Sequence, residues 1–241
     1  MPRFFIEVSY KGTRYAGFQI QHNANSIQAE IEKALQIFYK QKFELTGSSR
    51  TDAGVHAFQN YFHFDTEVPV LDDVYNLNAI LPVDIVISRI FKVNENAHCR
   101  FDAVSREYHY YIYQHKNPFL LDRAYYVPYS VNIGLMQQAA KEILNHIDFT
   151  SFAKRNTQVK SFLCNIQTSE WVEETGCLIY KIKGNRFLRG MVKGLVGTML
   201  LTGRNKLSIE EFKSIIEAKD CTKADFSVPP DGLFLYKVEF Q

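Results

Sequence analysis

Between two predicted strands the sequence reads Ser48-Ser49-Arg50-Thr51-Asp52-Ala53-Gly54-Val55-His56-Ala57. We expect strands at residues 43–46 and 60–64, with a glycine-containing turn between them. The turn brings together a cation, a carboxylate and an imidazole in Arg50, Asp52 and His56. Loops held by rigid strands often carry catalytic groups. A surface ion pair between Arg50 and Asp52, with His56 capping the next strand, explains the same residues, so the stretch alone leaves both interpretations open.

The first half of the chain predicts the order strand, helix, strand, strand, helix, strand. Residues 4–10 alternate as a strand does, and an aromatic loop with two glycines follows at 11–21. From Ser26, a suitable N-cap, to residue 41 the apolar residues recur at helical spacing. A second helix is expected at 71–80 and a further strand at 84–93.

The second half repeats this order with one additional helix. We expect strands at 107–114, 160–172, 176–183 and 233–240 and helices at 132–145, 187–201 and 208–218. The order β-α-β-β-α-β is that of the ferredoxin-like unit. The sequence therefore predicts an α+β protein with two ferredoxin-like halves, residues 1–104 and 105–241. Their antiparallel sheets are expected to join, with helices covering one side and an active-site cleft between the halves.

Composition indicates a globular protein with a large hydrophobic core. The chain has 241 residues, 46% of them hydrophobic, which suffices for a large core. It has no apolar run of membrane-spanning length and no signal peptide at its start, so we expect a cytoplasmic protein without membrane contact. The net charge of +2 excludes no class of partner. The four cysteines lie far apart without Cys-x-x-Cys spacing, which argues against disulfides and against a zinc site.

Two more stretches carry candidate functional residues. The strand from Arg106 to Tyr113 contains four tyrosines, which either pack within the sheet or offer a ring on which a nucleobase stacks. In the predicted helix 187–201 and just before it, Arg186, Arg189 and Lys193 are spaced at i, i+3 and i+7, so we expect them to share one basic face. That face is either solvated or contacts a polyanion. Gly190, Gly194 and Gly197 predict close packing against another backbone.

These three stretches together resemble the tRNA pseudouridine synthase A family. The family's loop motif Arg-Thr-Asp-Ala-Gly-Val-His-Ala matches Arg50 to Ala57. Its motifs Arg-x-Tyr-x-Tyr-x-Ile and Phe-Leu-x-x-Met-Val match residues 106–112 and 187–192. Shorter matches lie at residues 10–21, 149–152 and 229–233, so the resemblance covers the whole chain in the family's order.

The resemblance implies a function and a set of site residues. It implies a homodimeric enzyme that converts uridine to pseudouridine at positions 38, 39 and 40 in the anticodon stem-loop of tRNA, without cofactor or metal. The family's catalytic aspartate falls on Asp52, its active-site tyrosine on Tyr108 and its RNA-binding loop arginine on Arg50. Lys193 stands where the family usually has an arginine paired with the catalytic aspartate. We expect Arg186 and Arg189 to contact the RNA backbone.

The chemistry suits these residue types. Breaking the bond between uracil N1 and ribose C1′ requires a carboxylate near C1′, as nucleophile or as base, and the sequence leaves both roles open for Asp52. Tyr108 could stack on the uracil and help to remove the C5 proton. A paired uridine must also be flipped out of the stem, at a cost of roughly a few kcal/mol, and Arg50 could fill the vacated space or hold the phosphate.

Three positions depart from the family pattern. Ser49 replaces a glycine, Phe18 replaces a tryptophan, and Lys193 replaces an arginine, which keeps the charge but loses the bidentate fork. Two other functions remain open: an RNA-binding protein without catalysis, and a metal hydrolase using Asp52 and His56, for which no third ligand is evident. We interpret His56 as a structural residue of the turn.

Overall fold

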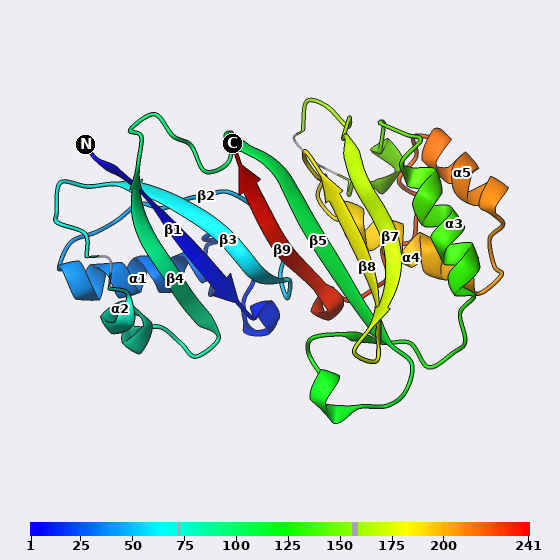
Figure 1. Ribbon diagram of the computed structural model, residues 1–241, viewed down its shortest axis with the longest axis horizontal. Helices are drawn as coiled ribbons and strands as arrows, with labels where there is room; N and C mark the ends of the chain where they lie inside the picture. The colour runs from blue at the N-terminus through cyan, green and yellow to red at the C-terminus, as the bar shows by residue number, and fades with distance from the viewer. Residues whose placement is uncertain (72, 156–158) are drawn as a thin grey trace. The chain divides into compact units, whose positions relative to one another are not determined.

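The computed structural model describes residues 1–71, 73–155 and 159–241 (Figure 1). The chain divides into two compact units. Unit 1 contains Met1–Val104 together with Phe234–Gln241, and unit 2 contains Ser105–Leu233. Each unit combines strands with helices, so the protein belongs to the α+β class.

The sheet of unit 1 has the strand order β4-β1-β3-β9. Strand β1 (Arg3–Tyr10) pairs antiparallel with β3 (His56–Asp65) and with β4 (Ile85–Val93), and the two-residue strand β2 (Thr46–Gly47) pairs antiparallel with β3. Strand β9 (Leu233–Phe240) is parallel to β3. Within residues 1–104 the strand pairs are antiparallel, as predicted. The parallel partner β9 comes from the predicted second half, and local periodicity does not record the direction of such a long-range pairing.

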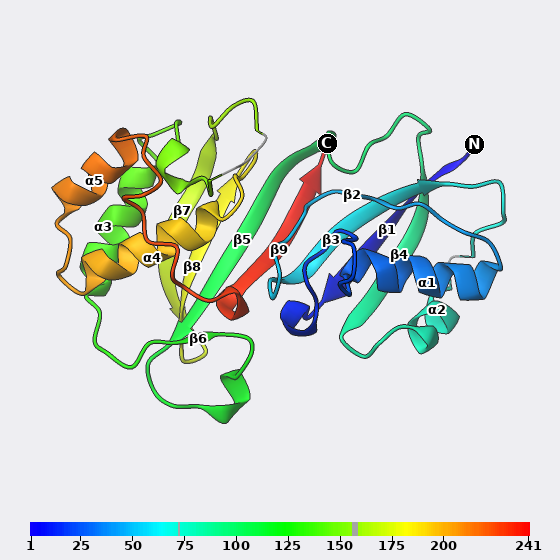
Figure 2. The same cartoon turned by 180° about the vertical axis from the view of Figure 1, so that it is seen from behind.

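Helices α1 (Ile27–Tyr39) and α2 (Tyr75–Ile80) lie on one face of this sheet (Figure 2). Helix α1 begins as predicted, since the Ser26 hydroxyl accepts a hydrogen bond from the backbone N–H of Ala29. Its stripe of Ile27, Ile31, Ala34 and Leu35 is buried, so the core lies between helices and sheet.

Helix α2 begins later than the predicted range 71–80, of which residue 72 lies outside the described residues. The Asp73 carboxylate accepts a hydrogen bond from the N–H of Tyr75 at 2.9 Å. Aspartate side chains that bond the backbone two residues on favour a turn over a helix, which explains the late start. The predicted strand 43–46 is likewise reduced to β2, whereas β3 begins at His56, four residues before its predicted start.

The sheet of unit 2 has the strand order β5-β8-β7. Its strands β5 (Ala103–Tyr113), β8 (Cys177–Gly184) and β7 (Ile166–Glu174) are antiparallel, and the short strand β6 (Tyr125–Tyr126) pairs with β5 in parallel. Helices α3 (Ile133–Ile143), α4 (Met191–Gly203) and α5 (Ile209–Glu217) lie on one side of the sheet (Figure 2). Nearly every side chain of α4 is buried, which explains its apolar composition.

Helix α4 begins at Met191, not at residue 187 as predicted. Gly190, its N-cap, has a φ of 74°, a left-handed conformation that favours glycine. Arg186 and Arg189 therefore precede the helix, and the predicted basic face that they share with Lys193 does not exist. The predicted close packing against another backbone is confirmed for Gly197, where a Cβ would collide with the carbonyl oxygen of Asp225. At Gly190 and Gly194 the nearest atoms belong to side chains instead.

Within the described ranges, no helix combines the length and the apolar character that a membrane span requires.

Candidate active site

The loop from Ser48 to Val55 connects β2 to β3 and is held by backbone hydrogen bonds on both sides. The N–H of Ser48 donates to Tyr61 O at 2.8 Å, and the N–H of Phe18 donates to Thr51 O at 3.1 Å. The N–H of Val55 donates to Asp52 O at 3.2 Å and closes a turn. Asp52 thus lies in a braced turn, and its side chain is half-buried.

A buried side-chain network fixes the residues just before Asp52. The Asn60 amide, fully buried on β3, donates to Ser49 O at 2.9 Å and to the Tyr10 hydroxyl at 3.1 Å. The Tyr10 hydroxyl is in turn bonded to the Thr51 hydroxyl at 2.8 Å. Strands β1 and β3 therefore hold both neighbours of Arg50 through buried groups that find their partners inside the protein.

His56 helps to hold this loop in place. Its ring is fully buried, and Nδ1 accepts a hydrogen bond from the N–H of Gly12 at 2.9 Å. Gly12 packs so closely that a Cβ there would collide with the carbonyl oxygen of Val55. These contacts agree with a structural role for His56.

Asp84 anchors the loop of residues 11–21 that packs on the Asp52 loop. The Tyr15 hydroxyl donates to Asp84 Oδ1 at 2.6 Å, and Arg14 Nε donates to Oδ2 at 2.8 Å. Burial alone would raise the pKa of the Asp84 carboxyl, but the hydrogen bonds from Tyr15 and Arg14 outweigh it and lower the pKa below its ordinary 3.8. Burial and the same carboxylate raise the pKa of Tyr15.

The loop contains two buried hydroxyl groups. Ser48 and Ser49 are buried, and their Oγ atoms have no hydrogen-bond partner among the described residues. Each such group costs about 1 to 3 kcal/mol unless a water molecule satisfies it. Ser49, which replaces the family's glycine, does not adopt a positive φ, so its backbone is unstrained as expected.

Tyr108 lies on β5 in unit 2 and is half-buried. Its ring packs edge-on against Phe187, with centroids 5.0 Å apart and an interplanar angle of 75°. Tyr110 on the same strand is fully buried, and its hydroxyl donates to Pro229 O at 2.8 Å. Tyr110 therefore packs within the fold, whereas Tyr108 keeps part of its surface open. Stacking of a nucleobase on Tyr108 stays a prediction.

The cations of unit 2 differ in their surroundings. Lys193 lies in the first turn of α4 and is half-buried, Arg186 is half-buried between β8 and α4, and Arg189 is exposed. Arg50, in unit 1, is exposed as well. Asp52 and Arg50 belong to one unit and the other predicted site residues to the second, so their convergence stays a prediction.

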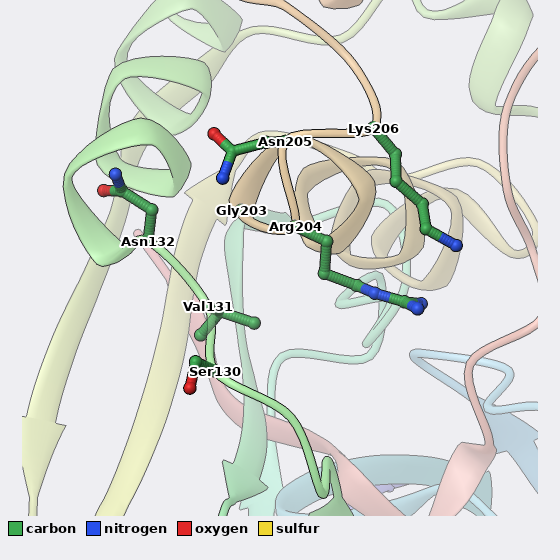
Figure 3. Close-up of a pocket in the computed structure, with 7 residues that line it drawn as sticks. All are labelled: Ser130, Val131, Asn132, Gly203, Arg204, Asn205 and Lys206. Carbon is green, nitrogen blue, oxygen red and sulfur yellow. The ribbon is translucent and has the colours of Figure 1, made fainter.

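A surface pocket of about 480 Å³ opens elsewhere in unit 2, between the start of α3 and the end of α4 (Figure 3). It is lined by residues 130–132 and 203–206, and the guanidinium of Arg204 lies 4.0 Å from the centre of the Tyr129 ring. Arg204, the C-cap of α4, follows Lys193 by eleven positions, or about 16 Å along a helix. The pocket contains none of the predicted site residues.

Comparison with known proteins decides the family. A family model described as tRNA pseudouridine synthase matches residues 6–102 and 139–241. The chain belongs to this family.

Relatives of this tRNA pseudouridine synthase match over nearly their full length. The protein is 43% identical to tRNA pseudouridine synthase A of Parabacteroides distasonis, covering 100% of this chain and 96% of the relative. It is 44% identical to the protein of that name from Bacteroides thetaiotaomicron, with coverage of 100% and 91%. A third, from Staphylococcus aureus (strain Newman), is 35% identical, with coverage of 98% and 90%. The family model includes the Asp52 loop and α4, but Tyr108 lies outside its matched segments.

Proposed function

We propose that this tRNA pseudouridine synthase converts uridine to pseudouridine at positions 38, 39 and 40 of the anticodon stem-loop, with Asp52 as the catalytic carboxylate. Membership of the family makes the protein an isomerase that acts on uridine in tRNA. The observation that carries the role of Asp52 is the braced loop, in which buried hydrogen bonds hold Ser49 and Thr51 on either side of Arg50. Catalytic groups require such preorganisation.

The proposed reaction is an isomerisation. The bond between uracil N1 and ribose C1′ breaks, the uracil turns, and a bond forms between C5 and C1′. Asp52 acts at the sugar, either as nucleophile at C1′ or as base. The proton on C5 is then lost and N1 gains one, so the atoms balance without an oxidant or a reductant. The isomerisation therefore needs no redox cofactor, and we propose that it uses no other cofactor and no metal.

The remaining site residues have separate roles. Tyr108 stacks on the flipped uracil and assists removal of the C5 proton; its partly open ring, packed on Phe187, supports this role. Lys193 pairs with Asp52 and helps to keep it ionised. Arg50, Arg186 and Arg189 contact the RNA, and the exposure of Arg50 and Arg189 suits phosphate binding.

We also propose the architecture that this site requires. The two halves, residues 1–104 and 105–241, are ferredoxin-like, their sheets join, and the active-site cleft lies between them. In unit 1, the element order β1-α1-β2-β3-α2-β4 and the pairing of β2 with β3 support this assignment. The enzyme works as a homodimer in the cytoplasm, binds the anticodon arm of tRNA, and has no contact with membranes.

Replacement of Asp52 tests the proposed function. With tRNA labelled with tritium at uracil C5, Asp52→Asn should abolish tritium release, because the carboxylate is lost while the shape of the side chain is kept. Glu44→Gln, which removes an exposed carboxylate in the same unit, serves as the matched control and should release tritium at the wild-type rate. Binding of tRNA should change less than about twofold in both variants. Turnover by Asp52→Asn would refute the assignment.

A further inference from the structure

Three side chains that the proposed reaction does not use converge in unit 1. They are His63 on β3 and the consecutive pair His98 and Cys99, which follow β4. Their possible ligand atoms, two imidazole nitrogens and one sulfur, all lie within 4.8 Å of one another. His63 Nδ1 is 3.1 Å from Cys99 Sγ, and the two imidazole rings are 4.6 Å apart at 66°.

The cluster is sheltered but has one accessible side. Cys99 is fully buried, His63 is 6% exposed, and His98 is half-buried. The Cys99 thiol donates to Thr46 O at 3.2 Å, which places the sulfur between β2 and β3. The backbone N–H of His98 donates to the Asp102 carboxylate at 2.7 Å, so the turn that carries His98 and Cys99 is itself fixed. Both halves of the cluster are thus held by neighbouring groups.

The local charge does not oppose a cation. Two guanidinium groups belong to residues near the cluster. Arg100, which follows Cys99, is exposed, and its guanidinium lies over the Phe101 ring. Arg3 donates from both Nε and Nη2 to the Asp65 carboxylate at 2.7 Å. Its Nη1 donates to Ala97 O at 2.8 Å, so the positive charge of Arg3 is held by a carboxylate beside the cluster. The Asp102 carboxylate adds a further negative charge next to His98.

We propose that His63, His98 and Cys99 form a zinc-binding site. Two imidazoles and a thiolate are the donors that zinc prefers, whereas Mg²⁺ and Ca²⁺ require oxygen ligands. Zinc bonds of about 2.0 to 2.3 Å in a tetrahedron place ligand atoms about 3.3 to 3.6 Å apart. The sulfur and the His63 nitrogen are already near that separation. Closing the longest separation, which is at most 4.8 Å, needs a movement of up to about 1.5 Å, which the half-buried His98 ring can make.

Zinc binding releases one proton, because the Cys99 thiol becomes a thiolate ligand while zinc keeps its oxidation state. Water fills the fourth position from the exposed side of His98. Arg100 N–H, which donates to His98 Nδ1 at 3.2 Å, gives up that bond if this nitrogen becomes the ligand. The ion joins β3 to the segment after β4 and so stabilises unit 1; it takes no part in the isomerisation. The cysteine spacing could not reveal this site, because two of its three ligands are histidines.

Cobalt(II) provides a spectroscopic probe for the test. Chelator-treated, full-length protein titrated with Co²⁺ should show a thiolate-to-metal charge-transfer band that saturates at one equivalent and disappears when Zn²⁺ is added. Cys99→Ala should remove the band and weaken zinc binding by more than about 100-fold, since even outer-shell partners of a metal are worth 10-fold to 100-fold. Cys164→Ala, which removes a buried thiol of unit 2, is the matched control and should leave the band unchanged.

Stability gives a second readout. Zinc should raise the melting temperature of the wild-type protein and of Cys164→Ala but not that of Cys99→Ala. If Cys99→Ala does not fold, His98→Gln at the half-buried position replaces it and should also lose the zinc-dependent shift. A charge-transfer band that persists in Cys99→Ala, or the lack of both the band and the shift in the wild-type protein at a hundredfold excess of metal, would overturn the proposal. The tritium-release test of Asp52 is independent of either result.

Discussion

The amide of Asn60 on β3 donates a hydrogen bond to the backbone oxygen of Ser49, three residues before Asp52, at 2.9 Å. Asn60→Val should therefore leave Ser49 O and the Tyr10 hydroxyl without this donor and destabilise the protein by about 2 kcal/mol. We also expect kcat to fall more than KM rises, because the Asp52 loop is no longer held in one position. Urea denaturation and tritium-release kinetics measure the two effects. Tyr10→Phe removes the other half of the network and should act in the same direction; a variant with normal stability and normal kcat would contradict this role.

The lowered pKa of Asp84 predicts a pH-dependent contribution to stability. A carboxyl whose pKa is lower in the folded state stabilises the fold fully above its unfolded value, here 3.8, and loses this effect as pH falls through the folded value. At pH 7, Asp84→Asn should be less stable than the wild-type protein by about 1 kcal/mol. The difference should shrink below about pH 4. Denaturation at pH 7 and at pH 3 measures it, with Tyr15→Phe as the partner variant; a difference that grows on acidification would exclude this explanation.

Tyr108 and Tyr110 form a matched pair on one strand. Tyr108→Phe keeps the ring against Phe187 but removes the hydroxyl, so kcat should fall at least about tenfold while the melting temperature changes little. Tyr110→Phe removes a buried hydrogen bond to Pro229 O and should lower the melting temperature while kcat is retained. Single-turnover tritium release and thermal denaturation distinguish the two. The reverse pattern would show that Tyr108 is a packing residue.

Lys193 should act on catalysis more than on affinity, because its proposed partner is Asp52 and not a phosphate. Lys193→Ala is expected to lower kcat by about 100-fold, the size of effect that removal of one electrostatic stabiliser has in other enzymes. Lys193→Arg, which retains the charge, should recover most of the activity. Filter binding measures tRNA affinity, and tritium release measures kcat. If tRNA affinity falls and turnover does not, Lys193 contacts the RNA backbone.

Arg186 and Arg189 should contribute to affinity through phosphate contacts. Each change to alanine should weaken tRNA binding and reduce the slope of log K against log salt by about one unit or slightly less. Titrations of tRNA binding between low and moderate salt give the slope directly. Lys206→Ala, at the exposed pocket in Figure 3, is a cationic control in the same unit and should not change it. An unchanged slope for Arg189→Ala would remove that residue from the interface.

Much of the fold could be predicted because its signals are local. Helix α1 follows from the cap at Ser26 and the apolar stripe after it, and both are visible in the sequence. The start of α4 was not predictable by the same means, since Phe187 and Leu188 continue the helical periodicity and only the left-handed Gly190 interrupts it. The parallel pairing of β3 with β9 joins segments far apart in the chain and leaves no periodic signal.

The residues of the candidate site could also be predicted from the sequence only in part. Asp52, Arg50 and Tyr108 could be proposed because their neighbours form a contiguous motif. Asn60 and Asp84 were missed, since each acts through tertiary hydrogen bonds to residues at least ten positions away. One signal was available for Asn60: an uncharged amide at a buried position of a strand needs partners inside the protein.

The parallel pairing of β9 with β3 also constrains how the protein is made. During translation, β1, α1, β3 and β4 leave the ribosome long before β9, so one edge of β3 has no strand beside it at residues 56 and 57 until Phe234 and Leu235 arrive. Unpaired strand edges invite association with other chains. A nascent chain of this protein therefore depends on the later-made β9, or on a chaperone in the interval, to keep this edge of β3 from pairing with another chain.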